Sequence, residues 1–183
     1  MNGETSAPAA GADARRILKT RAQELAREPE REPAAEGFLE VVEFVLSGER
    51  YAVETAQVRE VHQLRNLTAL PCTPAFVAGI VNLRGQILAV VNLKKFFGLP
   101  ERGITEFDKV IVVRAGEMEL GLLADDILGV RAVPVGAIGP APAALSGLRK
   151  EYLKGVTAEP LIVLDVAKLL ADPRIRVQEE VEP

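Results

Sequence analysis

The sequence predicts a mainly β protein built from two similar small barrels or sandwiches. From Phe38 onward, short stretches rich in β-branched residues alternate with glycine and proline, a pattern typical of small antiparallel barrels. Motifs of the first half also return in the second half in the same order. The chain has 183 residues, enough for one domain or two small ones and for a core that needs no disulfide or metal.

The two ends of the chain differ in composition from the middle. Residues 1–37 are rich in Ala, Glu, Arg and Pro, and we expect an N-terminal helical extension there. Its helix is predicted over residues 13–27, because Asp13 can serve as an N-cap and apolar residues follow at helical spacing. Residues 172–183 hold four acids and two bases and are predicted to form a flexible tail.

The globular part opens with a predicted hairpin. Residues 38–46 are β-branched and aromatic, residues 47–50 have turn composition, and residues 51–53 resume the apolar pattern. Further strands are predicted over residues 58–64, 78–83 and 86–93.

An internal repeat is the most informative feature of the chain. Gly48 belongs to a turn-and-strand motif that returns at Gly116, 68 positions later. Gly79 and Gly155 stand in a second pair of matching strands, 76 positions apart. The order of the motifs is kept and the offset is nearly constant, so the sequence predicts two similar halves.

Each half ends in a predicted short capping helix. Asn92 and Asp165, 73 positions apart, each precede apolar residues at helical spacing and can act as N-caps. We expect a domain over residues 38–171, with two interleaved barrel subdomains roughly at 38–98 and 108–171. Barrels packed side by side leave a groove between them, and binding sites favour such seams.

Composition excludes several classes of function. The chain has one Cys and one His, so we expect no internal disulfide and no multi-His or multi-thiolate metal site. The net charge of −4 and the 4% aromatic content argue against a nucleic-acid binder. No stretch approaches the ~18 apolar residues that span a bilayer, and the N-terminus lacks a signal sequence. We therefore expect a cytoplasmic protein.

Candidate catalytic groups are few. Asp125 and Asp126 are neighbours, and an extended chain points them to opposite sides, so we expect structural or solvated roles. Cys72 is expected to be a small buried apolar group. His62 is expected to be a surface histidine on the same strand face as Glu60. No phosphate-binding loop of the Walker or dinucleotide type occurs. The sequence thus favours a binding protein without catalytic residues, cofactor or metal.

Residues 82–86, NLRGQ, are placed for function. Two predicted strands meet at this tight turn, where Gly85 can supply the positive φ that such a turn needs. Arg84 is held at the turn, and its guanidinium offers a rigid fork of donors suited to a carboxylate. Glu60 is a strand carboxylate that we expect nearby. From spacing alone, an exposed arginine without a role remains the other interpretation.

Residues 74–93, PAFVAGIVNLRGQILAVVNL, closely resemble the central signature of CheW-type coupling proteins of bacterial chemotaxis. Similar stretches occur at 44–53, 58–61, 151–155 and 161–165. The resemblance covers residues 38–170. The same domain forms the regulatory end of the CheA histidine kinase and part of CheV-type proteins. No kinase, phosphotransfer or receiver region is recognised here, so the chain resembles the stand-alone coupler.

The resemblance implies two intertwined SH3-like five-stranded barrels with short capping helices. It also implies a non-enzymatic adaptor that couples membrane chemoreceptors to a CheA-type histidine kinase, meeting the membrane only through the receptors. At matching positions, Val58, Glu60 and Arg84 are implied to lie near the receptor-contacting face. We hypothesise that Glu60 and Arg84 form an ion pair at the rim of the groove between the barrels.

Two alternatives stay open. One is a small-barrel nucleic-acid-binding protein, which the acidic charge opposes. The other is an enzyme with an unrecognised site built from dispersed carboxylates such as Glu60 and Asp125. No motif supports the enzyme.

Overall fold

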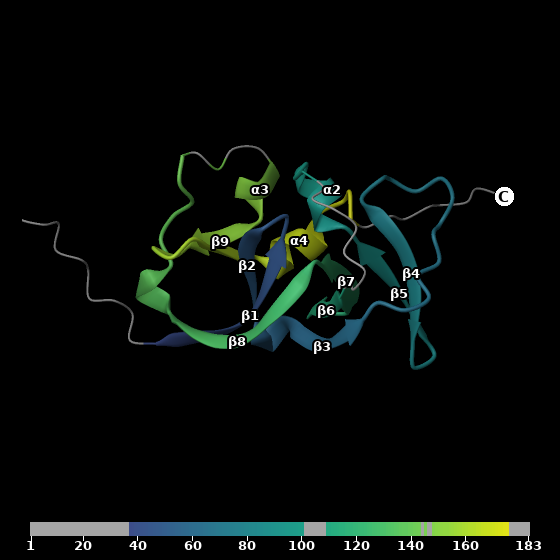
Figure 1. Ribbon diagram of the computed structural model, residues 1–183, viewed down its shortest axis with the longest axis horizontal. Coiled ribbons are helices and arrows are strands. Elements are labelled where there is room, and N and C mark those ends of the chain that lie inside the picture. Colours follow the sequence, from purple (N-terminus) through teal and green to yellow (C-terminus); the bar gives the residue numbers. More distant parts are fainter. Residues whose placement is uncertain (1–36, 101–108, 144, 146–147, 176–183) are drawn as a thin grey trace, which may run out of the picture. The chain divides into compact units, whose positions relative to one another are not determined.

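The computed structural model (Figure 1) describes residues 37–100, 109–143, 145 and 148–175. The predicted helix over residues 13–27 lies outside the described residues. The described part is mainly β, with two five-stranded sheets and a few short helices. We call the sheet that contains the first strand sheet 1 and the other sheet 2.

Sheet 1 has the strand order β8-β1-β2-β10-β9, and sheet 2 has the order β3-β6-β7-β5-β4. Sheet 1 consists of β1 (Phe38–Leu46), β2 (Glu49–Glu54), β8 (Asp126–Pro134), β9 (Leu153–Val156) and β10 (Leu161–Leu164). Sheet 2 consists of β3 (Val58–Gln63), β4 (Val77–Leu83), β5 (Gln86–Val91), β6 (Lys109–Ala115) and β7 (Met118–Ala124). The helices are η1 (Thr55–Gln57), α2 (Leu93–Phe97), η2 (Val135–Ala137), α3 (Leu148–Glu151) and α4 (Val166–Ala171).

The two sheets exchange their hairpins. The repeat equates β1–β5 with β6–β10, and this substitution turns the strand order of sheet 1 into that of sheet 2. The hairpin β1–β2 joins β8, β9 and β10 of the second half, while β6–β7 joins β3, β4 and β5 of the first half. Two pairs, β2 with β10 and β5 with β7, are parallel. Each sheet therefore combines a hairpin from one half of the chain with three strands from the other half.

Asn92 and Asp165 cap their helices as predicted. Asn92 Oδ1 accepts hydrogen bonds from the backbone N–H groups of Lys94 (3.0 Å) and Lys95 (3.3 Å) at the start of α2. Asp165 accepts one from the backbone N–H of Lys168 (3.0 Å) at the start of α4. These bonds satisfy donors that a helix start leaves without partners, so the short helices begin at defined residues.

The recurring strand glycines mark a close approach of two backbones. A Cβ on Gly79 would overlap the carbonyl oxygen of Thr68, and a Cβ on Gly155 would overlap that of Gly139. At both places an isolated bridge pairs the loop with the strand. The same contact in each sheet explains why glycine returns at this point of the repeat.

One apolar cluster joins the two sheets. Phe44 and Tyr51 of sheet 1 stack with their ring centroids 6.0 Å apart. Tyr51 in turn stacks on Phe97 of α2 at 6.5 Å. All three rings are buried. Each sheet also encloses a smaller apolar cluster drawn from its own strands. The two barrels are thus packed together through the α2 and α4 helices and the shared core.

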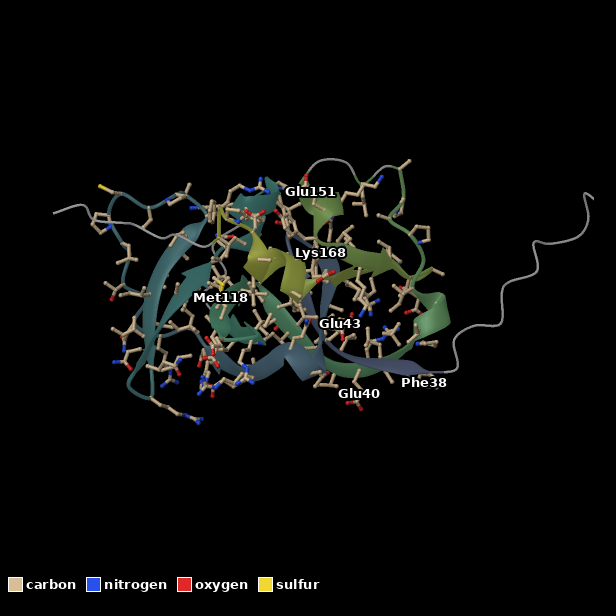
Figure 2. The ribbon with its side chains drawn as sticks, turned by 180° about the vertical axis from the view of Figure 1, so that it is seen from behind. Phe38, Glu40, Glu43, Met118, Glu151 and Lys168 are labelled. Carbon is tan, nitrogen blue, oxygen red and sulfur yellow. The ribbon has the colours of Figure 1, made fainter. Side chains whose placement is uncertain are left out.

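A carboxylate is buried inside sheet 1. Glu43 of β1, labelled in Figure 2, is only 4% exposed. It is ion-paired with Arg50 of β2 and, at 3.5 Å, with Arg131 of β8. Arg131 also reaches Glu159 at 3.2 Å. These pairs supply the compensation that a buried charge requires.

A second buried ion pair lies where the chain passes from one sheet to the other. Asp125 stands between β7 of sheet 2 and β8 of sheet 1. Its carboxylate accepts from Lys94 Nζ on α2 and from the Ser47 N–H (2.8 Å) in the β1–β2 turn. Its own N–H donates to the carbonyl of Val45 (3.0 Å). Asp126 points to a different partner, Lys109, so the two neighbouring carboxylates have the structural roles expected of them.

We predict that Asp125→Ala lowers the free energy of unfolding by about 3–5 kcal/mol, because it leaves the Lys94 ammonium buried without its counter-charge. Urea unfolding measures the change. Asp126→Ala is the matched control. Its side chain is 55% exposed, so the loss there should stay within about 1 kcal/mol. Equal losses in the two variants would contradict a special role for Asp125.

The residues after α4 are packed, so the predicted flexible tail begins too early. Asp172 and Ile175 are 8% and 4% exposed. The Asp172 carboxylate accepts hydrogen bonds from the Tyr152 hydroxyl and from the Arg174 guanidinium (2.7 Å). Arg174 also lies over the Phe96 ring, 5.6 Å from its centroid. The charged composition was misleading because these charges satisfy one another; residues 176–183 lie outside the described part.

The Asp172 cluster predicts a loss of stability in acid. The Arg174 guanidinium, helped by the Tyr152 hydroxyl, holds the pKa of Asp172 well below its ordinary value. A carboxylate with a depressed folded-state pKa stabilises the fold above its unfolded pKa of about 4, and this contribution is lost as the pH falls further. Asp172→Asn should therefore be less stable than the parent at pH 7, and the difference should shrink toward pH 2.

Urea midpoints between pH 7 and pH 2 measure this effect. Glu117→Gln, at the exposed β6–β7 turn, controls for the change in net charge. A stability difference for Asp172→Asn that is the same at pH 2 and pH 7 is the contrary result.

Candidate functional site

Arg84 occupies a strained position in a tight turn. The turn joins β4 to β5 through Arg84 and Gly85, whose φ angles are 53° and 89°. Positive φ at both central residues is typical of a type I′ hairpin turn. The Asn82 side-chain oxygen accepts from the Gly85 N–H at 2.8 Å. The sequence predicted a positive φ for Gly85 alone. The turn fixes the backbone of Arg84 and leaves its side chain 81% exposed.

Glu60 lies beside this turn and has two cationic or polar neighbours. Residues along β3 alternate between half-buried and exposed. Glu60 and His62 share one face, as predicted, but that face is half-buried, whereas His62 was expected to be a surface histidine. His62 Nε2 lies 2.8 Å from Glu60 Oε2, whereas Arg84 Nη2 lies 3.6 Å from the same oxygen. The hypothesised ion pair of Glu60 and Arg84 is present, but His62 is the nearer partner.

The electrostatics of Glu60 follow these distances. The nearby His62 side chain lowers the pKa of Glu60 below its ordinary value, and the charges of Arg84 and Arg59 add smaller effects. The carboxylate is therefore ionised at neutral pH, and its charge faces the open edge of sheet 2.

Glu60, His62 and Arg84 form a charged cluster at the gap between β3 and β4, the two edge strands of sheet 2. A depression of about 270 Å³ lies there, and its walls include His62 from β3, Val81 and Leu83 from β4, and Val110 from β6. A narrow crevice of about 10 Å³ adjoins it at Leu83 and is also lined by Glu60. These adjoining depressions lie within sheet 2, whereas the sequence analysis placed the ion pair at a groove between the barrels.

Three further polar side chains tie β3 to strands that are not its neighbours. Arg59 Nη1 donates to Gln86 Oε1 of β5 (2.9 Å) and to Glu119 Oε2 of β7 (2.5 Å). Gln86 Nε2 donates to Glu119 as well (3.0 Å). Sequence reasoning missed Glu119, because it comes from the other half of the chain. The bridge holds β3 and the Arg84 turn in a fixed relation.

The family model of the CheW-like domain matches residues 40–174. The chain belongs to the CheW-like family.

The chain is similar to several chemotaxis proteins. The chain is 31% identical over 144 residues to the chemotaxis protein CheW of Treponema pallidum, covering 75% of this chain and 85% of that one. It is 35% identical over 133 residues to the protein FrzA of Myxococcus xanthus, covering 69% and 82%. Its fold is similar to the crystal structure of the scaffolding protein TtCheW from Thermoanaerobacter tengcongensis. That match has a TM-score of 0.62, 29% identity and coverage of 70% and 89%.

These findings confirm the family resemblance and the fold class predicted from the sequence. They place the chain among the chemotaxis scaffold proteins of the CheW family. Proteins of this family are in general scaffolds and not enzymes. The two carboxylates named for an enzyme site also have separate partners, since Glu60 faces His62 and Arg84 while Asp125 binds Lys94.

Val58 differs from the other two predicted site residues of this CheW-like chain. It is half-buried and packs against the apolar cluster shared by the two sheets. It pairs with Val113 of β6, and the register shifts between Val58 and Glu60. Val58 therefore anchors the start of β3 in the core, whereas Glu60 and Arg84 are the charged residues at the edge of sheet 2.

Several apolar side chains are exposed on the strands of both sheets. Ile87, just after the Arg84 turn, is 68% exposed, and Val61 of β3 is 43% exposed. On the edge strand β8, Leu128 and Val130 are 52% and 64% exposed. The sequence analysis did not single out these residues, because apolar residues in strands are ordinarily assigned to the core.

The structure also tests the expectations for Cys72, for metal sites and for membrane-spanning helices. Cys72 is exposed and has a φ of 61°, so the expectation of a buried thiol was wrong. Within residues 37–100, 109–143, 145 and 148–175, no three His, Cys, Asp or Glu side chains gather in a way that could hold a metal ion. None of the helices in the described ranges has the length and apolar character needed to cross a membrane.

Proposed function

We propose that this CheW-like chain couples chemoreceptors to a CheA-type histidine kinase as a non-enzymatic adaptor in a bacterial chemosensory array. The proposal places it in the cytoplasm, where it meets the membrane only through the receptors. The partners are the tip of the receptor's cytoplasmic helical hairpin and the homologous regulatory domain of the kinase. The observation that carries the proposal is the charged cluster of Glu60 and Arg84, presented on a rigid turn at the open edge of sheet 2.

The energetics of the cluster favour a role in contact with a partner. An exposed ion pair contributes about 0–1 kcal/mol to folding, and Arg84 is 81% exposed with its nitrogen 3.6 Å from Glu60. The pair therefore does little for the stability of the chain itself. Charges at the rim of an interface instead fix the orientation of the partner and exclude wrong partners.

Apolar side chains supply the affinity in this proposal. A helical tip that lies on sheet 2 can bury Val61 and Ile87, which are 43% and 68% exposed. Burial of such groups is the usual source of affinity when a helix docks on a surface. Because the two-residue turn already fixes the Arg84 backbone, little backbone conformational entropy is lost when the partner binds.

A reconstitution of the complex tests the proposal. The full chain is mixed with a soluble receptor cytoplasmic fragment and a CheA-type kinase from the same organism. We expect a ternary complex in which the kinase responds to the receptor only when the chain is present. A chain that binds neither the receptor fragment nor the kinase would overturn the proposal.

We predict that Arg84→Ala weakens binding of the receptor fragment by about tenfold, equivalent to about 1.4 kcal/mol. The melting temperature should stay nearly unchanged, because the side chain is exposed and its ion pair is long. Isothermal titration calorimetry and thermal unfolding measure the two quantities. Lys150→Ala, an exposed cation on α3, serves as the control. Normal receptor binding by Arg84→Ala, or its failure to fold, would contradict the assignment.

A further inference from the structure

We propose that Glu119 of β7 is a positioning residue, whose carboxylate ties the tip of the β4–β5 hairpin to β3 and so holds Arg84 in place for the receptor. This inference rests on the proposed function and adds to it a residue from the other half of the chain. Glu119 acts through Gln86 and Arg59, which both donate hydrogen bonds to its carboxylate, and not through a contact of its own with the receptor.

The tip of the β4–β5 hairpin extends beyond the strand pairing that holds its base. The backbone pairing of β5 with β7 involves Val90 and Val91, at the end of β5. Gln86, the first residue of β5, precedes this ladder and pairs with Leu83 of its own hairpin. β4 is an edge strand of sheet 2, and Figure 1 shows the tip of the hairpin projecting from the sheet. The backbone ladder therefore fixes the base of the hairpin and leaves its tip to side-chain contacts.

A depression separates this tip from the β6–β7 hairpin. Its volume is about 460 Å³, and residues 86–89 of β5 line one side while Arg114 and Glu117 line the other. It lies at the end of β5 that the ladder with β7 does not include. Any connection between the tip and β7 must therefore come from side chains.

Glu119 makes this connection. Its Oε2 accepts hydrogen bonds from Gln86 Nε2 at 3.0 Å and from Arg59 Nη1 at 2.5 Å. Arg59 Nη1 also donates to Gln86 Oε1 at 2.9 Å, so the three side chains form a closed set of hydrogen bonds. The Glu119 side chain is 14% exposed and that of Arg59 is 46% exposed, so the carboxylate is the more enclosed group of the ion pair.

Both partners of Glu119 are next to the charged cluster. Gln86 directly follows the two turn residues, and Arg59 directly precedes Glu60. The register of β3 against β6 shifts at Arg59, and a bulge of this kind redirects the side chain of the extra residue. One carboxylate thus connects the strand positions on both sides of the pair of Glu60 and Arg84.

The strand below Glu119 is firmly held. β7 pairs with β6 in a continuous register that places Glu119 opposite Arg114. The ion pair with the half-exposed Arg59 adds little to folding stability, so the effect of the bridge lies in where it holds the tip. A tip that is ordered before the receptor arrives loses less conformational entropy on binding.

Nitrogen-15 relaxation of the backbone amides tests the positioning role in the protein alone. Glu119→Ala should lower the order parameters of residues 85–87 and leave those of residues 90–91 unchanged, because the ladder with β7 remains. Glu119→Gln keeps an acceptor oxygen and should restore part of the rigidity. Glu117→Ala removes an exposed carboxylate of the same depression and should change nothing at the tip. Unchanged order parameters at the tip in Glu119→Ala would overturn the inference.

Receptor binding tests the consequence. Glu119→Ala should weaken binding of the receptor fragment about fivefold, because a mobile tip must be ordered when the receptor binds. Glu119→Gln should recover part of this affinity, and Glu117→Ala should bind as the parent does. The melting temperature of Glu119→Ala should stay close to that of the parent. A large fall in melting temperature together with the loss of binding would indicate a purely structural role and would contradict the proposal.

A double variant separates positioning from direct contact. Gln86→Ala already removes the link between the tip and β7, so the further change Glu119→Ala should have little additional effect on receptor affinity. Additive losses would show that Glu119 acts independently of the hairpin and would refute the positioning role. If the parent chain does not bind the receptor fragment, the proposed function fails, whereas the relaxation data still decide whether Glu119 positions the tip.

Discussion

The exchange of hairpins between the two halves is the constraint on which the rest of the structure depends. The parallel pairs of β2 with β10 and of β5 with β7 each join a strand of one half to a strand of the other. The pairs of β1 with β8 and of β3 with β6 do the same. Each five-stranded sheet therefore forms only when both halves are present. The polar bridge beside the Arg84 turn also joins the two halves, since Glu119 of β7 accepts hydrogen bonds from Arg59 of β3 and Gln86 of β5.

Charged side chains serve two different purposes in this fold. The pair of Lys94 and Asp125 is nearly buried and joins α2 to the junction of the two sheets. Asp172 and Arg174 similarly fasten the end of the described chain onto Tyr152 and Phe96. Each carboxylate in these pairs accepts more than one hydrogen bond, which is what makes a buried charge tolerable.

The pair of Glu60 and Arg84 lacks this arrangement, because only its carboxylate is enclosed. The difference in burial distinguishes the charges that hold the fold from those that remain for a partner.

Local patterns predicted the local structure well, and long-range pairing escaped them. The strand positions, the two N-caps at Asn92 and Asp165, and the turn at Gly85 follow from side-chain chemistry within a few residues. The exchange of hairpins does not follow from them. The repeat offset is the same whether each half forms its own sheet or contributes strands to both sheets. The family resemblance implied that the two barrels are intertwined, and the strand order shows which strands are exchanged.

The candidate site was also predictable only in part. The same-face spacing of Glu60 and His62 is a property of any strand, and the structure has it. That His62 rather than Arg84 lies nearest the carboxylate could not be predicted, because the distance depends on how β3 and the β4–β5 turn meet across the open edge. The packing of Asp172 was missed for a similar reason, since Tyr152 is 20 positions away in the sequence.

Two of the four described non-glycine residues with positive φ differ in how the fold offsets their backbone strain. Ser47 has a φ of 52° and Arg84 a φ of 53°, and each departs from the conformation that its residue type prefers. At Ser47 the cost is offset within the molecule, because its N–H binds Asp125 and its hydroxyl binds the carbonyl of Pro100 at 2.6 Å.

At Arg84 the side chain makes a 3.6 Å ion pair with Glu60 and no hydrogen bond within the described residues. A glycine or asparagine would occupy this turn position at lower cost. Strain that the fold does not offset by its own contacts is typical of a residue kept for binding. This contrast between two equally strained positions links the backbone of the Arg84 turn to the partner contact proposed for its side chain.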